Sequence, residues 1–224
     1  MINKKVGLIL TGGFIELELL QEFLMTHEVL WVIAVDKGLM SAYALSLPVD
    51  RIVGDFDSVD RSALDKYKEG IFGKVPDVIT LCPEKDMTDT QVALEWAVSQ
   101  SSDLEEIVLL GATGSRMDHV IANMNLLKIP LYNHVKACIL DKNNKIYLEN
   151  ESFFITKSNL YGSYISLLPF TEKVTGLTLK GFKYPLKNHT LTQGNSLGVS
   201  NEILDEKASV TMDSGILLVI ESKD

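Results

Sequence analysis

The sequence predicts an α/β fold class: an N-terminal domain with a parallel sheet covered by helices, followed by an all-β sandwich domain. Over residues 1–140, short apolar runs alternate with segments of helical spacing, which is typical of a parallel sheet. Over residues 141–224, short alternating segments are separated by glycine and proline, and no long helical pattern occurs. The turn cluster Asp141–Asn144 separates the two halves.

The apolar runs of the first half are short and nearly continuous, as expected of strands that are buried on both faces. In order, they predict strands at Val6–Thr11, Val29–Val35, Arg51–Asp57, Val78–Leu81, Ile107–Leu110 and Val135–Leu140. The segments between them repeat apolar residues at the helical period. They predict helices at Glu16–Met25, Leu39–Leu45, Arg61–Lys68, Asp89–Ser99 and Asp118–Leu127.

The second half contains clear strand candidates. TGLTLKGF (175–182) and SGILLVIES (214–222) alternate apolar and polar residues, as a half-buried antiparallel strand does. Together with the glycine punctuation, they predict a small sandwich or barrel at residues 141–224.

Composition limits the kind of partner. The chain has 224 residues, 46% of them apolar, and a formal net charge of −9 with no basic run. Because nothing neutralises a phosphate backbone, we expect no nucleic-acid surface. An acidic surface suits a cationic ligand, and a polyanionic ligand would need a metal cation as a bridge.

Cysteine usage and the N-terminus indicate a cytoplasmic protein. Cys82 and Cys138 are too few and too far apart for a disulfide framework or a zinc site, so both are expected to be reduced. The N-terminal stretch lacks the apolar region and cleavage site of a signal peptide, and no apolar run is long enough to span a membrane.

Four polar clusters follow predicted strands of the parallel sheet. Because the carboxyl ends of parallel strands meet at one edge, we expect these clusters to converge there and bind a ligand. They are residues 36–38 (DKG), 54–58 (GDFDS), 83–89 (PEKDMTD) and 111–119 (GATGSRMDH).

The cluster GDFDS predicts a Mg²⁺ site. In extended backbone, Asp55 and Asp57 would share a face roughly 7 Å apart and would repel each other without a cation. Oxygen-only ligands suit Mg²⁺, which brings phosphate groups with it. Asp86 and Asp89 complete the carboxylate set, and Lys85 is placed to meet a phosphate. The alternatives are a surface turn at Asp55 and Asp57, and simple complementarity of Asp89 to a helix dipole, with Thr88 and Gln91 as a capping box.

The cluster GATGSRMDH predicts an anion site. Glycines let backbone N–H groups approach an anion, the following helix start favours negative charge, and Arg116 can bind phosphate oxygens bidentately. The alternative is an ordinary strand-to-helix turn in which Asp118 caps the helix and His119 packs beside it.

With these residues in view, the chain resembles the thiamine pyrophosphokinases, in particular the bacterial form. Matching positions are Asp36 and Gly38, all of GDFDS, and the 83–89 and 111–119 clusters, followed by Asn123. In the second half, KGFKYPL (180–186) and SLGVSNE (196–202) continue the pattern. The resemblance spans nearly the whole chain, and only Lys37 and Ser115 depart from the family's usual glycines.

The resemblance implies a reaction and an assembly. Pyrophosphate would pass from ATP to the hydroxyl of thiamine, which gives thiamine diphosphate and AMP, with Mg²⁺ as cofactor. Residues 1–140 would form the ATP- and Mg²⁺-binding catalytic domain, and residues 141–224 the domain for thiamine binding and dimerisation. The enzyme would be a homodimer with thiamine at the subunit interface.

The resemblance also implies roles for individual residues. The predicted catalytic residues are Asp55, Asp57, Asp86 and Asp89, of which Asp55, Asp57 and Asp86 would hold Mg²⁺. Nucleotide-binding residues would be Asp36, Lys85, Thr113, Gly114, Arg116, Asp118 and His119. Thiamine would be bound by Asp89, Ser200 and Asn201, the last two of which are alternatively a polar turn.

Two other functions stay open on the sequence. A haloacid-type phosphatase would form an aspartyl phosphate on the first aspartate of D-x-D, here Asp55, although the preceding strand and a later lysine are not evident. A nucleotide-sensing module would bind without turnover, although binding alone needs fewer carboxylates. Thiamine-dependent formation of AMP separates both from a pyrophosphokinase.

Overall fold

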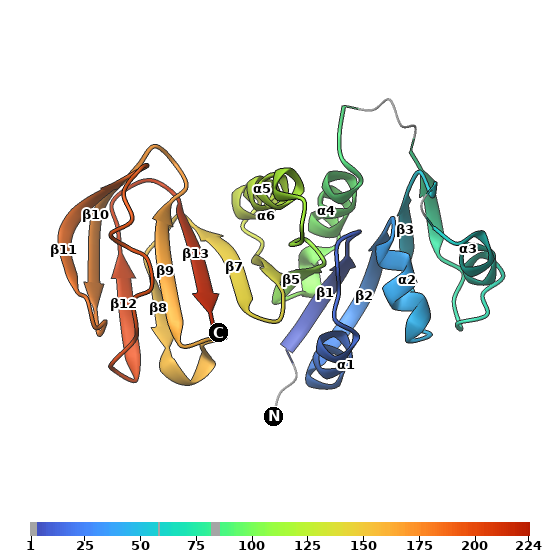
Figure 1. Cartoon of the computed structure of the whole chain (residues 1–224), viewed down its shortest axis with the longest axis horizontal. Coiled ribbons are helices and arrows are strands. Elements are labelled where there is room, and N and C mark those ends of the chain that lie inside the picture. Colours follow the sequence, from blue (N-terminus) through green and yellow to red (C-terminus); the bar gives the residue numbers. More distant parts are fainter. Residues whose placement is uncertain (1–3, 58, 82–85) are drawn as a thin grey trace. The chain divides into compact units, whose positions relative to one another are not determined.

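The computed structural model describes residues 4–57, 59–81 and 86–224. The chain divides between Lys142 and Asn143 into two compact units, which we call the α/β unit and the β unit (Figure 1). The α/β unit is a mostly parallel sheet with helices, and the β unit is antiparallel, so the predicted fold class is confirmed.

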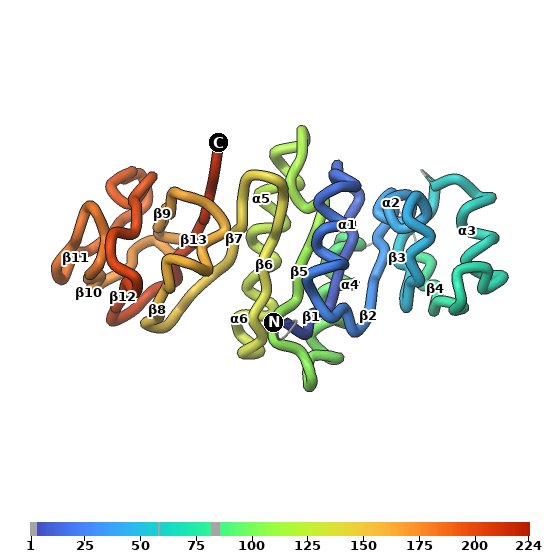
Figure 2. The backbone as a smooth tube through the Cα atoms, turned by 90° about the horizontal axis from the view of Figure 1, so that it is seen from below, coloured from blue at the N-terminus to red at the C-terminus, as the bar shows by residue number. Residues whose placement is uncertain are grey.

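The sheet of the α/β unit is built from parallel strands. Its strands are β1 (Lys4–Leu10), β2 (His27–Val35), β3 (Arg51–Gly54), β4 (Asp77–Thr80), β5 (Glu106–Leu110) and β6 (Ala137–Leu140). Within this unit they lie in the order β4-β3-β2-β1-β5-β6 (Figure 2), and every neighbouring pair is parallel.

Helices cover both faces of this sheet. They are α1 (Leu17–Thr26), α2 (Gly38–Ala44), α3 (Arg61–Lys68), α4 (Asp89–Ser99), α5 (Met117–Leu126) and α6 (Lys128–Tyr132), with a 3₁₀ turn at Ser101–Asp103. Right-handed crossovers place helices on opposite faces when the direction of travel across the sheet reverses. Accordingly, α4, α5 and α6 gather on one face, and α1 and α2 lie on the other (Figure 1).

The reversal of direction falls between β1 and β5. The chain moves from β1 outward to β4, then returns across the sheet to β5 and continues to β6. The connections that leave β1 and β5 therefore run to opposite faces, which opens a crevice between them at the carboxyl edge. In open parallel sheets, this switch point is the usual place for a ligand.

The centre of the sheet is buried and apolar. Leu8, Ile33 and Leu109 are fully buried, and Cys138 is a buried free thiol, as expected. Trp31 is also buried, and its ring meets the ring of Trp96 edge-on with 5.6 Å between the ring centroids. The Trp31 ring packs against Gly7, where a Cβ would collide with it. Close packing of this kind fixes the strands whose ends carry the polar clusters.

Two element boundaries differ from the sequence prediction. Strand β3 ends at Gly54 rather than Asp57, because Phe56 adopts a left-handed conformation with φ of 61° and ends the extended backbone. The last strand begins at Ala137 because α6 continues the predicted helix and a turn at His134, with φ of 56°, follows it. Pro130 stands in the first turn of α6, where its missing N–H costs little.

The β unit consists of two antiparallel sheets. Its strands are β7 (Asn144–Glu149), β8 (Phe153–Thr156), β9 (Tyr164–Pro169), β10 (Lys173–Lys180), β11 (Leu186–Thr192), β12 (Lys207–Thr211) and β13 (Leu217–Ser222), with a 3₁₀ turn at Lys157–Asn159. Strands β7-β13-β9 form one group and β11-β10-β12-β8 the other. Buried side chains of both groups, among them Leu167, Leu177 and Val219, form one core, as in the predicted sandwich.

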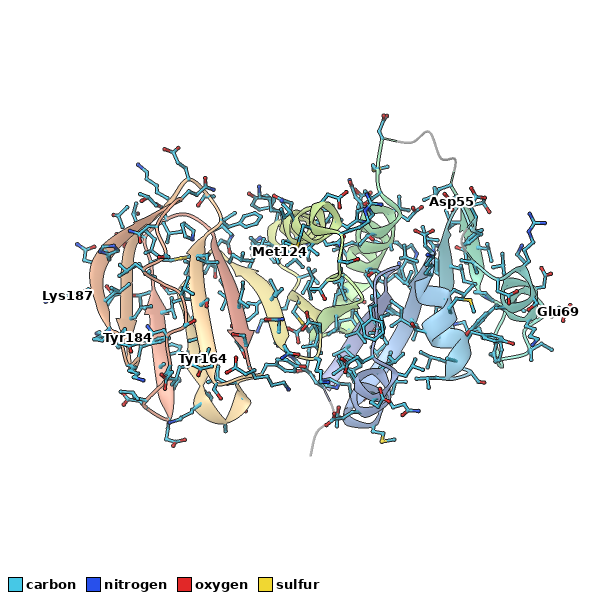
Figure 3. The ribbon with its side chains drawn as sticks, in the orientation of Figure 1. Asp55, Glu69, Met124, Tyr164, Tyr184 and Lys187 are labelled. Carbon is cyan, nitrogen blue, oxygen red and sulfur yellow. The ribbon has the colours of Figure 1, made fainter. Side chains whose placement is uncertain are left out.

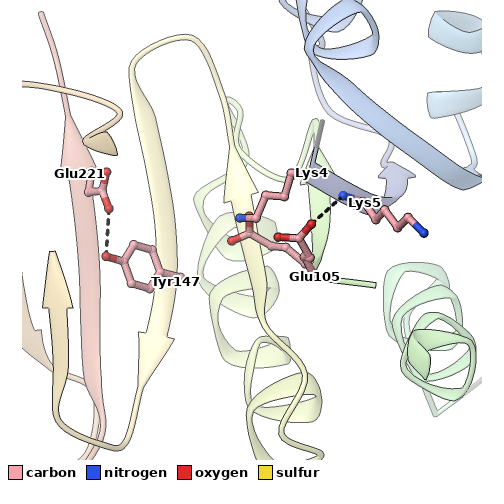
Figure 4. A network of polar contacts seen from close by, with 6 residues as sticks. Lys4, Lys5, Glu105, Tyr147 and Glu221 are labelled. Carbon is pink, nitrogen blue, oxygen red and sulfur yellow. Dashed lines mark hydrogen bonds and ion pairs between the residues drawn. The ribbon is translucent and has the colours of Figure 1, made fainter. Parts of the chain in front are cut away.

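Each unit contains a buried glutamate that is held by hydrogen bonds, and Figure 4 shows the one in the β unit, Glu221. In the β unit, buried Glu221 accepts hydrogen bonds from the Tyr147 hydroxyl at 2.9 Å and from the Tyr161 N–H at 2.7 Å. In the α/β unit, Glu106 accepts from Lys4 Nζ at 2.6 Å. These contacts satisfy buried carboxylates, and the one to Glu106 lies at the starts of β1 and β5, opposite the carboxyl edge of the parallel sheet. No helix in the described part of the chain is long and apolar enough to cross a bilayer.

Candidate active site

The parallel strands bring the predicted polar clusters to one edge of the α/β unit. Residues 36–37 follow β2, residues 55–57 follow β3, and residues 111–116 follow β5. Asp55 stands at this edge where β3 ends (Figure 3). The fourth cluster follows β4, and its Lys85, like Cys82, lies outside the described residues.

A pocket of about 550 Å³ opens at the switch point of the sheet. Its walls are residues 11–14 after β1, residues 36–37 after β2, residues 88–90 at the start of α4, residues 111–116 after β5, and the first turns of α5. Of the predicted nucleotide-binding residues, the pocket brings together Asp36, Thr113, Gly114, Arg116 and His119. It also includes Asp89, so residues from three of the four predicted clusters meet here.

The loop after β1 is a wall of the pocket that the sequence interpretation treated only as the end of a strand. The N–H and Oγ1 of Thr11 both donate to the Leu110 carbonyl, at 2.8 and 3.0 Å, and the Gly13 N–H donates to the Gly111 carbonyl at 3.1 Å. A Cβ at Gly13 would lie 2.1 Å from that carbonyl oxygen, so only glycine fits. The detectable signal was the glycine pair directly after the first strand.

The loop after β5 is held from the other side by α5. Buried Asn123 donates from Nδ2 to the Ala112 carbonyl at 2.8 Å, which fixes the backbone that leads into the helix. Helix α5 then begins at Met117 with its N-terminus at the pocket. Free N–H groups and the dipole at a helix start favour an anion, and the anion site at this cluster stays a prediction.

Arg116, which lines the pocket, forms an exposed bidentate pair with Asp118, which does not line it. Arg116 Nη2 lies 2.6 Å from Asp118 Oδ2, and Arg116 Nε lies 3.3 Å from Oδ1. Arg116 rather than Asp118 occupies the N-cap position of α5, so the alternative role of Asp118 as a helix cap is not seen. The hydrogen bond from Arg116 lowers the pKa of Asp118 to about 2, and the same bond raises the pKa of Arg116.

We expect Arg116→Gln to raise the pKa of Asp118 from about 2 to near its ordinary value of 3.8, because the charge-assisted hydrogen bond is lost. In the unchanged protein, the pair is fully formed above about pH 4 and breaks as the pH falls towards 2. The ¹³C shift of the Asp118 carboxyl, followed by NMR against pH, measures this. Lys68→Gln removes one positive charge from α3 and should leave the midpoint near 2. An unchanged midpoint in Arg116→Gln would rule out the pairing.

Asp36 and Asp89 present carboxylates to the pocket from fixed positions. Asp36 has a left-handed backbone, with φ of 47°, and its N–H donates to the Val53 carbonyl at 3.0 Å. A Cβ at Gly54 would lie 2.2 Å from Asp36 Oδ1, so glycine makes room for this carboxylate. Asp89 is the first residue of α4, directly after Thr88, whose side chain accepts the Gln91 N–H at 3.2 Å. The predicted cap at Thr88 is thus present, while the Gln91 side chain donates forward to Glu95.

The geometry expected for Asp55 and Asp57 is wrong in one respect. They do not lie on one extended strand, because β3 ends before them and the Asp57 N–H donates to Asp55 Oδ1 at 3.1 Å. An aspartate that accepts the N–H two residues ahead forms a turn of its own, as in the surface-turn alternative. Both carboxylates nevertheless stay on one short loop at the carboxyl edge.

The residues on the loops after β3 and β4 fit Mg²⁺ by their chemistry. Asp55, Asp57 and Asp86 offer only oxygen ligands, and β3 pairs with β4 in parallel, so their loops leave neighbouring strands. Among the described residues, no three Asp, Glu, His or Cys side chains lie close enough to hold a metal ion together. Mg²⁺ commonly takes one or two carboxylates and completes its shell with water and phosphate oxygens. The metal site therefore stays a prediction.

Ser200 and Asn201 lie in the β unit and differ in what they expose. Asn201 is 4% exposed; its Oδ1 accepts from the Tyr184 and Glu202 N–H groups at 3.0 and 2.9 Å, and its Nδ2 donates to the Tyr184 carbonyl at 2.9 Å. Ser200 is exposed, has φ of 55°, and donates its N–H to buried Ser166 at 3.0 Å. Of the two, Ser200 is the residue with a side chain presented outward.

Comparison with known proteins now identifies the chain's relatives. Residues 24–139 match the thiamin pyrophosphokinase catalytic domain, and residues 151–217 match the thiamin pyrophosphokinase vitamin B1 binding domain. Thiamine pyrophosphokinase of Bacillus subtilis (strain 168) is 34% identical over 195 residues, which cover 87% of this chain and 88% of that protein. The chain belongs to the thiamine pyrophosphokinase family.

Solved structures of the thiamine pyrophosphokinase family confirm the fold. The crystal structure of the Bacillus subtilis protein superposes with a TM-score of 0.85 at 32% identity, covering 99% of this chain and all of that one. The Geobacillus thermodenitrificans protein gives 0.82 at 31% identity, with 98% of each chain covered. The predicted family and fold are confirmed. Residues 11–14 of the pocket precede the part that matches the family's catalytic domain.

Proposed function

We propose that this chain is a Mg²⁺-dependent thiamine diphosphokinase, which transfers pyrophosphate from ATP to the hydroxyl of thiamine. The observation that carries the proposal is the pocket at the switch point. It combines an anion-binding loop and helix start at residues 111–117 with carboxylates from α4 and from the loop after β2. The substrates are inferred from the family. The pocket offers the anion-binding groups and carboxylates that such substrates require.

ATP is bound by the loop after β5. Backbone N–H groups at Thr113 and Gly114 and the start of α5 face phosphate oxygens, and Arg116 offers a planar guanidinium to the same charge. Asp118 holds Arg116 in place through its bidentate pair. His119 and Asp36 line the pocket beside them, and Lys85 adds a further positive charge.

Asp55, Asp57 and Asp86 hold Mg²⁺. When bound, the ion offsets charge on the phosphate oxygens. The Asp55 carboxylate accepts the Asp57 N–H, so the two residues share one short turn directly after β3. Asp57 is exposed and Asp55 half-buried, which leaves room for the water and phosphate oxygens that complete a Mg²⁺ shell.

Asp89 orients the hydroxyl of thiamine and accepts its proton. The hydroxyl oxygen attacks the β-phosphorus in line, a new oxygen–phosphorus bond forms, and the bond from the β-phosphorus to the oxygen of the α-phosphate breaks. AMP leaves with that oxygen, and Arg116 and Lys85 offset its charge. Asp89 suits this role because its position is fixed by the cap of α4 and it faces the pocket.

Thiamine is further bound by the 200–201 loop of the β unit in a homodimer, with the thiamine site at the subunit interface. Ser200 is the direct contact, and Asn201 holds the backbone of that loop against Tyr184. Light scattering of the purified chain tests the dimer. A buried free thiol at Cys138 is consistent with a reducing, cytoplasmic location.

The test of this function is formation of AMP and thiamine diphosphate from ATP, with thiamine and Mg²⁺ each omitted in turn. We expect AMP only when both are present, with loss of activity in excess EDTA and recovery with added Mg²⁺. Release of phosphate without thiamine, with a trapped phosphoryl group on Asp55, would favour the phosphatase. Tight nucleotide binding with no turnover under any of these conditions would favour the sensor.

A further inference from the structure

Phe14 is an exposed aromatic ring inside the pocket. It is 77% exposed, although it is a large apolar side chain, and it lines the same pocket as Arg116 and His119. Single exposed apolar residues are common on protein surfaces and by themselves indicate nothing. Phe14 differs in its surroundings, because it stands on the wall of a concave site that is lined by phosphate-binding groups.

The backbone that carries Phe14 is fixed. The preceding residue is held in place, since the Gly13 N–H is bonded to the Gly111 carbonyl and a side chain at Gly13 would collide with that carbonyl oxygen. Thr11 is bonded twice to the Leu110 carbonyl. The following residue, Ile15, is buried. The ring is therefore presented from a rigid loop, as a binding platform requires.

The order of the strands indicates which end of a nucleotide lies at which part of the pocket. The carboxylates of residues 55–57 follow β3, whereas Phe14 follows β1, two strands away and next to β5. Neighbouring strands are about 5 Å apart, so about 10 Å separates the ends of β1 and β3. A triphosphate with its terminal groups at the acidic loops and an inner phosphate at the start of α5 leaves its nucleoside to the loop after β1, where Phe14 lines the pocket. The nucleobase is the planar, largely apolar group that matches an exposed aromatic ring there.

We propose that Phe14 stacks against the nucleobase of the triphosphate substrate and is a positioning residue for the nucleotide. The inference rests on the proposed function, because it takes the pocket to be the nucleotide site. Stacking of a base on an aromatic side chain depends little on the identity of the base. Phe14 therefore contributes affinity for the nucleoside portion, while Arg116 and the start of α5 bind the phosphates.

The test compares two probes that differ in having a base. Binding of a non-hydrolysable ATP analogue and of inorganic tripolyphosphate, each with Mg²⁺, is measured by calorimetry on the unchanged chain and on Phe14→Ala. We expect Phe14→Ala to weaken binding of the ATP analogue about 10- to 100-fold and to leave tripolyphosphate binding unchanged. Tyr132→Ala removes another exposed aromatic ring, on α6, and should change neither.

A second variant reports stacking directly. In Phe14→Trp, the ATP analogue should quench the emission of the new tryptophan and tripolyphosphate should not, with affinity for the analogue retained. Equal losses for both probes in Phe14→Ala, no loss for the ATP analogue, or no base-dependent quenching in Phe14→Trp would each overturn the proposal. Failure of the proposed function would appear separately, as absence of thiamine-dependent AMP from the unchanged chain.

Discussion

Replacing Asp57 with asparagine is expected to lower kcat/KM for thiamine-dependent AMP formation about a thousandfold and to leave Tm nearly unchanged. A loss of that size corresponds to about 4 kcal/mol of transition-state stabilisation, which is reasonable for a group that holds a charge-neutralising cation. The fold should not suffer, because Asp57 is an exposed turn residue. Removal of one of two neighbouring negative charges should slightly stabilise the protein without its metal.

Asp60→Asn is the matched control for Asp57→Asn. It removes the same charge from the same connection between β3 and α3, and asparagine keeps the ability to cap α3 by accepting the Ser62 N–H, now at 2.8 Å from Asp60. We expect near-normal kcat/KM and Tm for this variant. Equal losses of activity and thermal stability in Asp57→Asn would contradict a metal-binding role and favour a structural one.

Asp89→Asn is expected to lower kcat about a thousandfold, with a much smaller change in binding of the ATP analogue. Loss of a positioned general base typically costs 10²- to 10⁴-fold, and an amide keeps the shape of the side chain while losing its ability to accept a proton. Single-turnover kinetics with saturating ATP and thiamine separates chemistry from binding.

Glu95→Gln is the control for Asp89→Asn. It neutralises an exposed carboxylate farther along α4 and should leave kcat unchanged. If Asp89→Asn keeps its kcat but loses thermal stability, Asp89 only complements the dipole at the start of α4. The catalytic role would then pass to another carboxylate.

Where the sequence carries local signals, it predicts element boundaries correctly. Helices α3 and α4 match their predicted ranges, because Asp60 and Thr88 are cap residues that mark the first turn. The strand at Arg51 was predicted too long, since the period of two cannot reveal that Asp55 turns the chain by accepting the Asp57 N–H. Helix α6 was missed because a helix that follows another without a turn signal leaves no boundary in the sequence.

The charged residues of the candidate site could be predicted from the sequence. Asp36, Asp89 and Arg116 stand out as polar residues after apolar strands, and all three line the pocket. The wall at residues 11–14 was overlooked because it consists of a threonine, two glycines and a phenylalanine, and its importance depends on β1 lying beside β5. That neighbour relation joins residues about a hundred positions apart, and no local pattern encodes it. The sequence likewise suggests Asn201 as a ligand contact. In the structure, its side-chain amide is hydrogen-bonded to backbone groups of Tyr184 and Glu202.

The central claim is that carboxylates on the loops after β3 and β4 hold a divalent ion on a triphosphate bound at the switch point. A crystal structure with Mn²⁺ in place of Mg²⁺, a non-hydrolysable ATP analogue and thiamine tests it most directly. We predict an anomalous peak about 2.1 Å from carboxylate oxygens of Asp55 or Asp57 and from phosphate oxygens of the analogue, with the phosphates at residues 113–116 and the nucleobase against Phe14. A metal that contacts no carboxylate of these loops, or a nucleotide bound outside this pocket, would contradict the account.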